Sequence, residues 1–281
     1  KKAEVDSQDK SMFLDTMSHD VRTPLIGIVG MLQVLEDSGL AQGQRRHVES
    51  ALLSARHLSQ LVSDILDISQ IESGRKTLAH AAFDLADLFA SVHALFATAA
   101  RENGVSLAMD VDAPVRRRVM GDEHKLRQVL GNLVGNAIKY SPQGEVRVQA
   151  GLLREDREAI RILVVVSDTG PGIPEAFLPR LCTPFSQAAA TADRKSGGVG
   201  LGLSIVSELV RLMQGEMVID SQEGRGTQAC LSMAFPVAPE AAQPPAGSAA
   251  DMAPVGLTIL LAEDDLVSRM ACLHVLEKMG H

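Results

Sequence analysis

The chain has 281 residues, a length typical of about two domains. Hydrophobic residues make up 46% and charged residues 22%, which excludes a fibrous or largely disordered protein. The net charge of −8, from 35 acidic and 27 basic residues, argues against a nucleic-acid partner. The three cysteines, Cys182, Cys230 and Cys272, are far apart, so neither a disulfide framework nor a zinc site is indicated.

No apolar stretch approaches the roughly 20 residues needed to cross a bilayer, and no signal peptide is visible. The chain begins at Lys1 and stops at His281 directly after a helix-like run. We therefore expect a cytoplasmic fragment without membrane contact. A longer protein that contains this fragment could still be anchored in the inner membrane by another segment.

Two amphipathic helices are predicted at the start of the chain, one from Val5 to Glu36 and a second through Ile68, ending before Ser73-Gly74. Their apolar residues recur at helical spacing and form two stripes: Phe13, Met17, Val21, Leu25, Ile28, Leu32 and Leu35, then Val48, Leu52, Ala55, Leu58, Val62 and Ile65. One helical hairpin buries little by itself. We therefore expect residues 1–75 to form a four-helix bundle in a homodimer.

His19 lies within Ser18-His19-Asp20-Val21-Arg22-Thr23-Pro24-Leu25 and, at about 100° per residue, faces away from the apolar stripe. A solvent-exposed imidazole is mostly unprotonated at neutral pH, because its usual pKa is about 6.5. Asp20 is adjacent and suited to orient the ring and accept its proton. The pattern is typical of an activated nucleophile, with an idle surface histidine as the alternative.

Together with Phe13-Leu14, this segment resembles the phosphoacceptor box of sensor histidine kinases. The resemblance implies that His19 is phosphorylated and that Asp20 is the adjacent acid or base. It also implies that Thr23 positions water when the same domain dephosphorylates a partner.

From about Ala82 the pattern changes to short strands interleaved with helices. This indicates an α/β sandwich over residues 80–236, with one helical layer over one sheet. Strands are expected at Val105–Asp110, Glu145–Leu152, Ile160–Ser167, Glu216–Asp220 and Thr227–Phe235, and helices at Leu85–Arg101, Glu123–Tyr140 and Gly202–Met213.

Four polar residues flank the apolar stripe of the helix capped by Asp122: Asn132, Asn136, Lys139 and Tyr140. Asparagine is a poor residue within a helix, so two on one face indicate a role. Amide oxygens suit Mg²⁺, a lysine neutralises phosphate and a tyrosine ring can lie against a base. The alternative is a merely polar surface.

Two glycine-rich segments follow. Asp168-Thr169-Gly170-Pro171-Gly172-Ile173-Pro174 comes directly after a predicted strand, where its glycines allow close approach of a flat ligand. Ser196-Gly197-Gly198-Val199-Gly200-Leu201-Gly202 opens a helix, whose free N–H groups suit phosphates. Taken alone, each segment is also compatible with an ordinary turn or loop.

In this order, the segments resemble the N, G1 and G2 boxes of the histidine-kinase ATP-binding domain, a fold shared with heat-shock chaperone and gyrase ATPases. Gly224-Arg225-Gly226-Thr227 resembles the G3 turn. The resemblance implies that Asn136 holds Mg²⁺ beside Asn132 and that Asp168 accepts the adenine amine. It also implies nucleotide contacts from Lys139, Tyr140, Gly170, Gly172, Gly198, Gly200, Gly202 and Thr227. The sequence departs from the family pattern at Val199, Leu181 and Ala229.

The last part of the chain comprises a predicted flexible linker over residues 237–256 and a segment over residues 257–281. Ile259-Leu260-Leu261-Ala262-Glu263-Asp264-Asp265 resembles the first strand and acidic pair of a receiver domain. About 25 residues are too few for a complete receiver. A solvated acidic tail is the alternative.

The resemblance, from Phe13 to Phe235, implies a hybrid sensor histidine kinase that uses ATP and Mg²⁺. His19 would be autophosphorylated, and the phosphoryl group would pass to an aspartate of a receiver domain or response regulator, with phosphatase activity as a further possibility. Two alternatives are an ATPase of the same fold without phosphohistidine and a catalytically weak dimeric scaffold.

Overall fold

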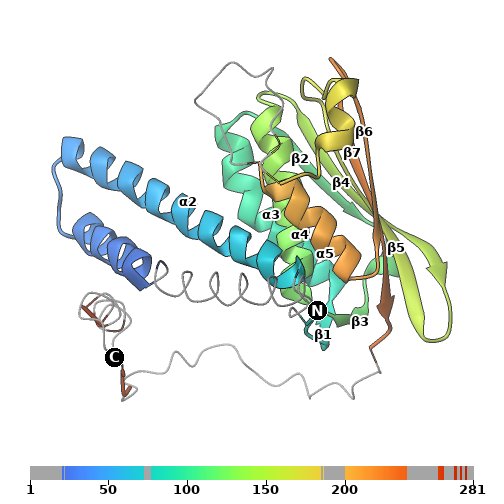
Figure 1. The fold of residues 1–281 in the computed structure, drawn as a ribbon, viewed down its shortest axis with the longest axis horizontal. Helices are drawn as coiled ribbons and strands as arrows, with labels where there is room; N and C mark the ends of the chain where they lie inside the picture. Colours follow the sequence, from blue (N-terminus) through green and yellow to red (C-terminus); the bar gives the residue numbers. More distant parts are fainter. Residues whose placement is uncertain are drawn as a thin grey trace, which may run out of the picture. The chain divides into compact units, whose positions relative to one another are not determined.

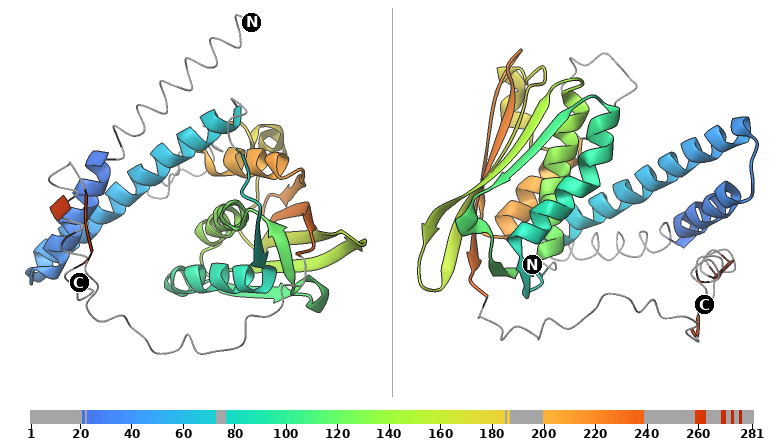
Figure 2. Two further views of the ribbon diagram at one scale, coloured as in Figure 1. Left: turned by 90° about the horizontal axis from the view of Figure 1, so that it is seen from below. Right: turned by 180° about the vertical axis from the view of Figure 1, so that it is seen from behind.

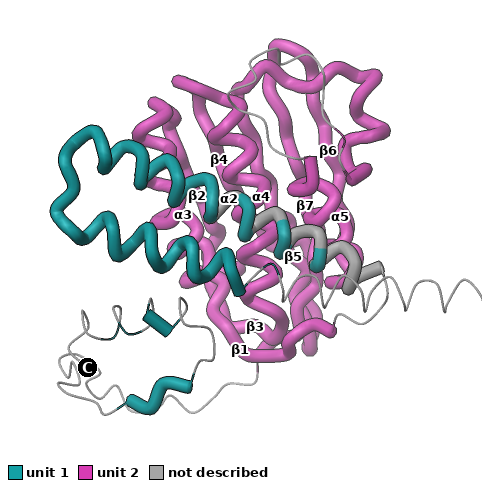
Figure 3. Tube along the Cα trace, turned by 60° about the vertical axis from the view of Figure 1, so that its left-hand side comes forward, with its two compact units in different colours: residues 1–73, 242–281 teal, residues 74–241 magenta. Residues whose placement is uncertain are grey.

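The computed structural model describes residues 21, 23–72, 77–184, 186, 200–238, 259–262, 269, 270, 273 and 276 (Figures 1 and 2). Three predicted site residues, His19, Asp20 and Gly198, lie outside these described residues. The chain divides into two compact units, residues 74–241 and residues 1–73 with 242–281 (Figure 3).

The smaller unit contains the predicted helical hairpin. One helix covers residue 21 and residues 23–37, and α2 (Gln42–Glu72) follows after a turn in which Gly39 has a φ of +74°. Leu25, Leu52 and Ala55 are buried, as the periodicity predicts. Ile28 and Leu35, from the same predicted stripe, are 49% and 45% exposed. One copy of the hairpin therefore leaves part of its apolar seam uncovered.

The larger unit is built on a five-stranded sheet with the strand order β2-β4-β5-β7-β6. The strands β2 and β4 are parallel, and the other neighbours are antiparallel. Their bounds are β2 (Ser106–Val111), β4 (Glu145–Glu155), β5 (Ala159–Asp168), β6 (Glu216–Gln222) and β7 (Gly226–Pro236).

Three helices, α3 (Leu85–Glu102), α4 (Glu123–Tyr140) and α5 (Gly202–Leu212), cover one face of this sheet (Figures 1 and 2). The predicted single helical layer over one sheet is therefore confirmed. Alternate residues of the central strands, including Ile162 of β5 and Leu231 of β7, are fully buried. The apolar stripe predicted for α4 is buried too: Leu126, Val129, Leu130, Leu133 and Ala137. Burial of each of these leucine and valine side chains contributes roughly 1.5–3 kcal/mol.

The structure contains two short strands that the sequence patterns did not predict. β1 (Ala81–Asp84) and β3 (Arg118–Gly121) form an antiparallel pair of their own. Four residues are too few to show an alternation. Val237, at the start of the predicted linker, also forms a bridge to Val119, so the ordered domain continues past β7. Two short 3-10 helices, η1 (Ala113–Val115) and η2 (Glu175–Arg180), lie between these elements in the sequence.

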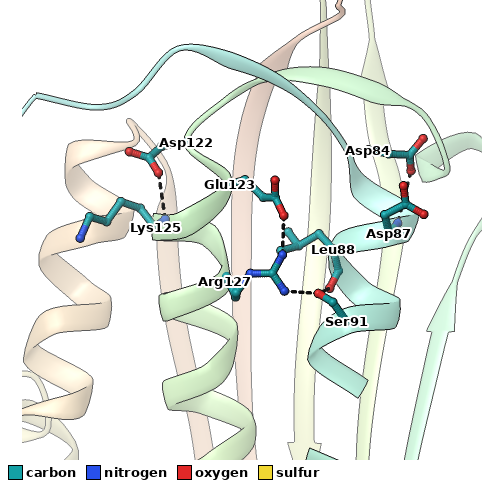
Figure 4. A network of polar contacts seen from close by, with 8 residues as sticks. All are labelled: Asp84, Asp87, Leu88, Ser91, Asp122, Glu123, Lys125 and Arg127. Atoms are coloured by element: carbon teal, nitrogen blue, oxygen red, sulfur yellow. Dashed lines mark hydrogen bonds and ion pairs between the residues drawn. The ribbon is translucent and has the colours of Figure 1, made fainter. Parts of the chain in front are cut away.

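Polar contacts join α3 to α4 near their N-terminal ends (Figure 4). Asp84 caps α3 by accepting a hydrogen bond of 2.7 Å from the backbone N–H of Ala86. Arg127 of α4 contacts Glu123 on its own helix and donates to the hydroxyl of Ser91 on α3. The two helices are thus joined near their N-terminal ends, which matters because α4 carries Asn132, Asn136, Lys139 and Tyr140 of the candidate site.

Candidate functional site

Asn132 and Asn136 lie one turn apart on α4, as their spacing predicts, and both are half-buried. They face the beginning of α5. A Cβ added to Gly202 would lie 3.7 Å from Nδ2 of Asn136 and 3.9 Å from Oδ1 of Asn132. Two helices distant in sequence therefore bring both amides and the first residue of α5 together.

The side chain of Asn132 has an unmet hydrogen-bonding group. Its Nδ2 is fully buried and has no hydrogen-bond partner in the part of the chain that the structure describes. Leaving a buried polar atom unpaired costs about 1–3 kcal/mol. A protein tolerates such an unpaired atom where a bound ligand supplies the missing hydrogen-bond partner. The amide oxygens of Asn132 and Asn136 suit a hard cation that also binds phosphate oxygens.

Asp168 ends β5 with its side chain held by three donors. The backbone N–H of Gly170 donates to Oδ1 at 2.8 Å, the hydroxyl of Ser141 at 3.2 Å and the N–H of Thr227 at 3.3 Å. These donors come from three separate parts of the chain, and all of them bond to the same oxygen. The carboxylate is therefore fixed in orientation, and no hydrogen bond from the described residues reaches Oδ2.

The turn after Asp168 requires glycine for reasons of space. A Cβ on Gly170 would lie 2.9 Å from the hydroxyl oxygen of Ser141 and 2.9 Å from Oδ1 of Asp168. Gly226 has a φ of +92°, and a Cβ there would overlap the carbonyl oxygen of Asp168. Close backbone approach at both points is what allows Thr227 to reach the carboxylate.

A second set of contacts fixes the far end of the turn. The N–H of Ile173 donates to the hydroxyl of Ser221 at 2.9 Å, and the N–H of Gly224 donates to the carbonyl of Pro171 at 2.6 Å. The hydroxyls of Ser221 and Thr227 are 2.9 Å apart. Gly172, with a φ of +69°, has no room for a side chain against Gln222. The turn from Asp168 to Pro174 is therefore held by hydrogen bonds and close packing at both ends, and we call it the glycine shelf.

Lys139 and Tyr140 are at the C-terminal end of α4. The ammonium nitrogen of Lys139 is 5.0 Å from the centre of the Tyr140 ring, and that ring is 40% exposed. An exposed ring next to a cation is suited to contact a planar base and an anionic group together. The carbonyl of Tyr140 also lies against Gly170, so the C-terminal end of α4 lies next to the turn after Asp168.

The beginning of α5 has the features of an anion site that the glycines predict. Gly200 has a φ of +78°, Leu201 is buried, and no side chain caps the helix at Leu201. Uncapped N–H groups and the positive end of the helix dipole favour negative charge there. Of the three glycines predicted to contact phosphate, Gly200 and Gly202 lie at this helix end.

The structure thus brings the predicted residues of the larger unit together in two groups that α4 connects. The first group is Asn132 and Asn136 with the beginning of α5 at Gly200 and Gly202. The second is the end of α4 at Lys139 and Tyr140 with Asp168, Gly170, Gly172 and Thr227. Thr23 is half-buried in the helix of the smaller unit. Ser141 and Ser221 also contribute to the site, although no sequence pattern indicates them. Ser141 is 1% exposed and directly follows Tyr140, but no local pattern shows which carboxylate it contacts.

Cys182 follows η2 and is a free cysteine. Partial burial raises the pKa of its thiol above the ordinary value, against a smaller lowering by a hydrogen bond with Ser207. A raised pKa keeps the thiol protonated at neutral pH, and a thiol is a weaker nucleophile than a thiolate.

Within the described part of the chain, no helix combines the length and the apolar character that a membrane span requires.

Two family models match the chain. The model described as histidine kinase-, DNA gyrase B- and HSP90-like ATPase matches residues 121–238, and the His Kinase A (phospho-acceptor) domain matches residues 9–74.

Curated relatives extend the similarity over nearly the whole chain. The sensor histidine kinase AruS of Pseudomonas aeruginosa is 34% identical over 280 residues, 99% of this chain and 28% of that protein. The autoinducer 2 sensor kinase/phosphatase LuxQ of Vibrio cholerae is 34% identical over 94% of this chain and 31% of that protein. The chain therefore spans less than a third of either relative.

A solved structure with the same fold is that of full-length ShkA in complex with AMPPNP. It is 33% identical, with a TM-score of 0.65, over 81% of this chain and 46% of that one.

Proposed function

The chain belongs to the histidine kinases, and on this basis we propose that it transfers the γ-phosphoryl group of ATP to His19. The observation that carries the proposal is that one chain combines a match to the phosphoacceptor domain over residues 9–74 with the fixed carboxylate and glycine shelf at Asp168. His19 lies within the matched range and in the box quoted above.

ATP would bind across the gathered region with its base at Asp168. Oδ2 of Asp168 would accept a hydrogen bond from the exocyclic amine of adenine, because three donors already occupy Oδ1. The ring of Tyr140 would lie against the base, and Lys139 would neutralise phosphate charge. The N–H groups at Gly200 and Gly202 would hold the phosphates, together with Gly198, which lies outside the described residues.

The donor set at Asn132 and Asn136 fits Mg²⁺ bound together with ATP. Asn136 would hold the ion through its amide oxygen, and the buried, unpaired Nδ2 of Asn132 would find its partner on a phosphate oxygen. The ion would neutralise charge on the phosphates.

Replacing Asn136 by Ala should weaken ATP binding roughly 10-fold in the presence of Mg²⁺. This factor is the lower end of the loss in affinity that substitutions at metal sites typically cause. Calorimetric titration with ATP in Mg²⁺ and, separately, in EDTA checks this result. The variant and the wild type should bind equally in EDTA, because the lost ligand then has no metal to hold. An equal loss in both buffers would contradict the metal role.

The transfer step requires a neutral imidazole and an acceptor for its proton. One ring nitrogen of His19 would attack the γ-phosphorus, the bond from that phosphorus to the bridging oxygen of ADP would break, and ADP would leave with the electron pair. Asp20 would accept the proton released by the ring. Positioning and charge neutralisation supply most of the rate enhancement in such reactions.

A homodimer would complete the hairpin. The smaller unit exposes several large apolar side chains to about half or more of their area: Ile26, Ile28, Leu35, Leu53 and Leu58. A second copy would cover them in a four-helix bundle, as the sequence pattern predicts.

The phosphoryl group would pass from His19 to an aspartate of a receiver domain or a separate response regulator. Residues 257–281 would be the start of such a receiver, as the acidic residues Glu263, Asp264 and Asp265 indicate. Phosphatase activity on the receiver, with Thr23 positioning water, is supported by the similarity to LuxQ, a protein named as a kinase/phosphatase.

Incubation with γ-labelled Mg-ATP tests the proposal. We expect label on the protein that is lost in acid and stable in alkali, the behaviour of a phosphohistidine. ATP turnover without bound label would instead support an ATPase of the same fold that forms no phosphohistidine. Binding of ATP with neither label nor turnover would support the scaffold.

A further inference from the structure

The two segments that connect the larger unit to the rest of the chain both attach to one strand, β3. The incoming segment forms β1, which pairs with β3 from Ala81 opposite Gly121 to Asp84 opposite Arg118. In the outgoing segment, Val237 bridges to Val119, and the N–H of Ala238 donates to the carbonyl of Arg118 at 3.2 Å.

Buried side chains strengthen this attachment. The rings of Phe83 on β1 and Phe235 on β7 meet edge to face, with centroids 6.2 Å apart. Val119 of β3 is fully buried. Gly121 leaves the space for both rings, since an added Cβ would lie 3.3 Å from Phe235 and 3.4 Å from Phe83. We call these residues and Val237 the β3 clasp.

Asp122 directly follows the clasp and bonds in two directions. Its Oδ1 accepts a hydrogen bond of 3.0 Å from the N–H of Lys125, which caps α4 (Figure 4). Its Oδ2 accepts one of 2.9 Å from the N–H of Ala79, in the incoming segment just before β1. Asp122 is buried, with a relative exposure of 7%.

Such a buried carboxylate is held in place because each oxygen has its own donor, and hydrogen bonds to a charged acceptor are the stronger ones. Rotating the side chain to release one donor would break the other bond. The backbone at Ala79 and the first turn of α4 therefore share a single anchor.

The helix that Asp122 caps carries Asn132 and Asn136, roughly 15 Å and 21 Å farther along its axis at 1.5 Å per residue. An α-helix transmits a displacement of its first turn along its length as a rigid element. A change at the incoming segment would thus reach the amides without any contact with them.

We propose that Asp122 is a positioning residue that couples the incoming segment, residues 77–84, to nucleotide binding through α4. The coupling rests on the proposed binding of ATP at Asn132 and Asn136. Because such coupling is reciprocal, bound nucleotide must also stabilise the incoming segment. The β3 clasp extends the same connection to the outgoing segment at Val237.

Hydrogen exchange of the backbone in residues 77–84, with and without AMPPNP and Mg²⁺, tests this on the full chain. In the wild type, saturating AMPPNP should slow exchange there at least roughly 5-fold, the lower end of typical coupling between sites. Asp122→Ser keeps a good helix cap, but its shorter side chain cannot also reach Ala79. The variant should still bind AMPPNP, and the slowing should fall below about 2-fold.

Asp84→Ser is the matched control, because Asp84 caps α3 in the same way and has no bond to Ala79. It should retain the nucleotide-dependent slowing. Equal slowing in Asp122→Ser and the wild type, with AMPPNP bound to both, would overturn the coupling alone. Failure of the wild type to bind AMPPNP would overturn the proposed function and the coupling with it.

Discussion

The variant His19→Gln should incorporate no phosphate from γ-labelled Mg-ATP while binding ATP as tightly as the wild type. Glutamine has no ring nitrogen with a free electron pair for attack on phosphorus, so the acceptor is removed. The proposed ATP site is built from residues of α4, α5, β5 and β7, none of which contains residue 19. Label counted after alkaline treatment, together with an ATP titration of the same preparation, checks both halves of the expectation.

His47→Gln provides the matched control for this change. His47 is an exposed histidine in α2 and lies outside the phosphoacceptor box. Its replacement should leave the incorporation of label unchanged. If His19→Gln retained label at the wild-type level, the assignment of His19 would be wrong and another residue would be the acceptor.

The variant Asp168→Asn should bind ATP roughly 10- to 150-fold more weakly, the range that corresponds to 1.5–3 kcal/mol for a hydrogen bond to a charged group. The donors at Gly170, Ser141 and Thr227 would keep an oxygen at the position of Oδ1. The amide NH₂ of the variant would then face the adenine amine, so that a donor would meet a donor. Calorimetry or competition with a fluorescent nucleotide measures the loss.

A purine riboside triphosphate without the 6-amino group separates this effect from a general loss of structure. The wild type should prefer ATP over this analogue, whereas Asp168→Asn should bind the two about equally. Asp220→Asn, at an exposed position in β6, is the control and should retain the preference. An unchanged preference in Asp168→Asn would show that its carboxylate does not contact the base.

Most local features of the site were predictable from the sequence. The helical period places Asn132 and Asn136 on one face of α4, and the predicted bounds of that helix agree with the structure. Asp168 ends a strand, as the apolar run before it indicates, and the glycines open α5. These features follow from residues a few positions apart, where periodicity and glycine chemistry act directly.

The contacts that orient the site were not predictable in this way. Ser141 and Thr227 meet at Asp168 from 27 and 59 positions away, and their meeting depends on which strands become neighbours. The prediction of a linker from residue 237 likewise missed the bridge from Val237 to Val119. Nothing near Val237 in the sequence indicates a partner more than a hundred residues earlier.

The sequence by itself determined the helical hairpin, the layered α/β unit and the order of the nucleotide-binding segments, because hydrophobic period and turn residues act over short distances. The tertiary structure alone decided that donors from Gly170, Ser141 and Thr227 all meet at Oδ1 of Asp168. It also decided that Asp122 joins Ala79 to α4. A hydrogen bond between distant residues exists only after the sheet has set its register, and no local pattern encodes that register.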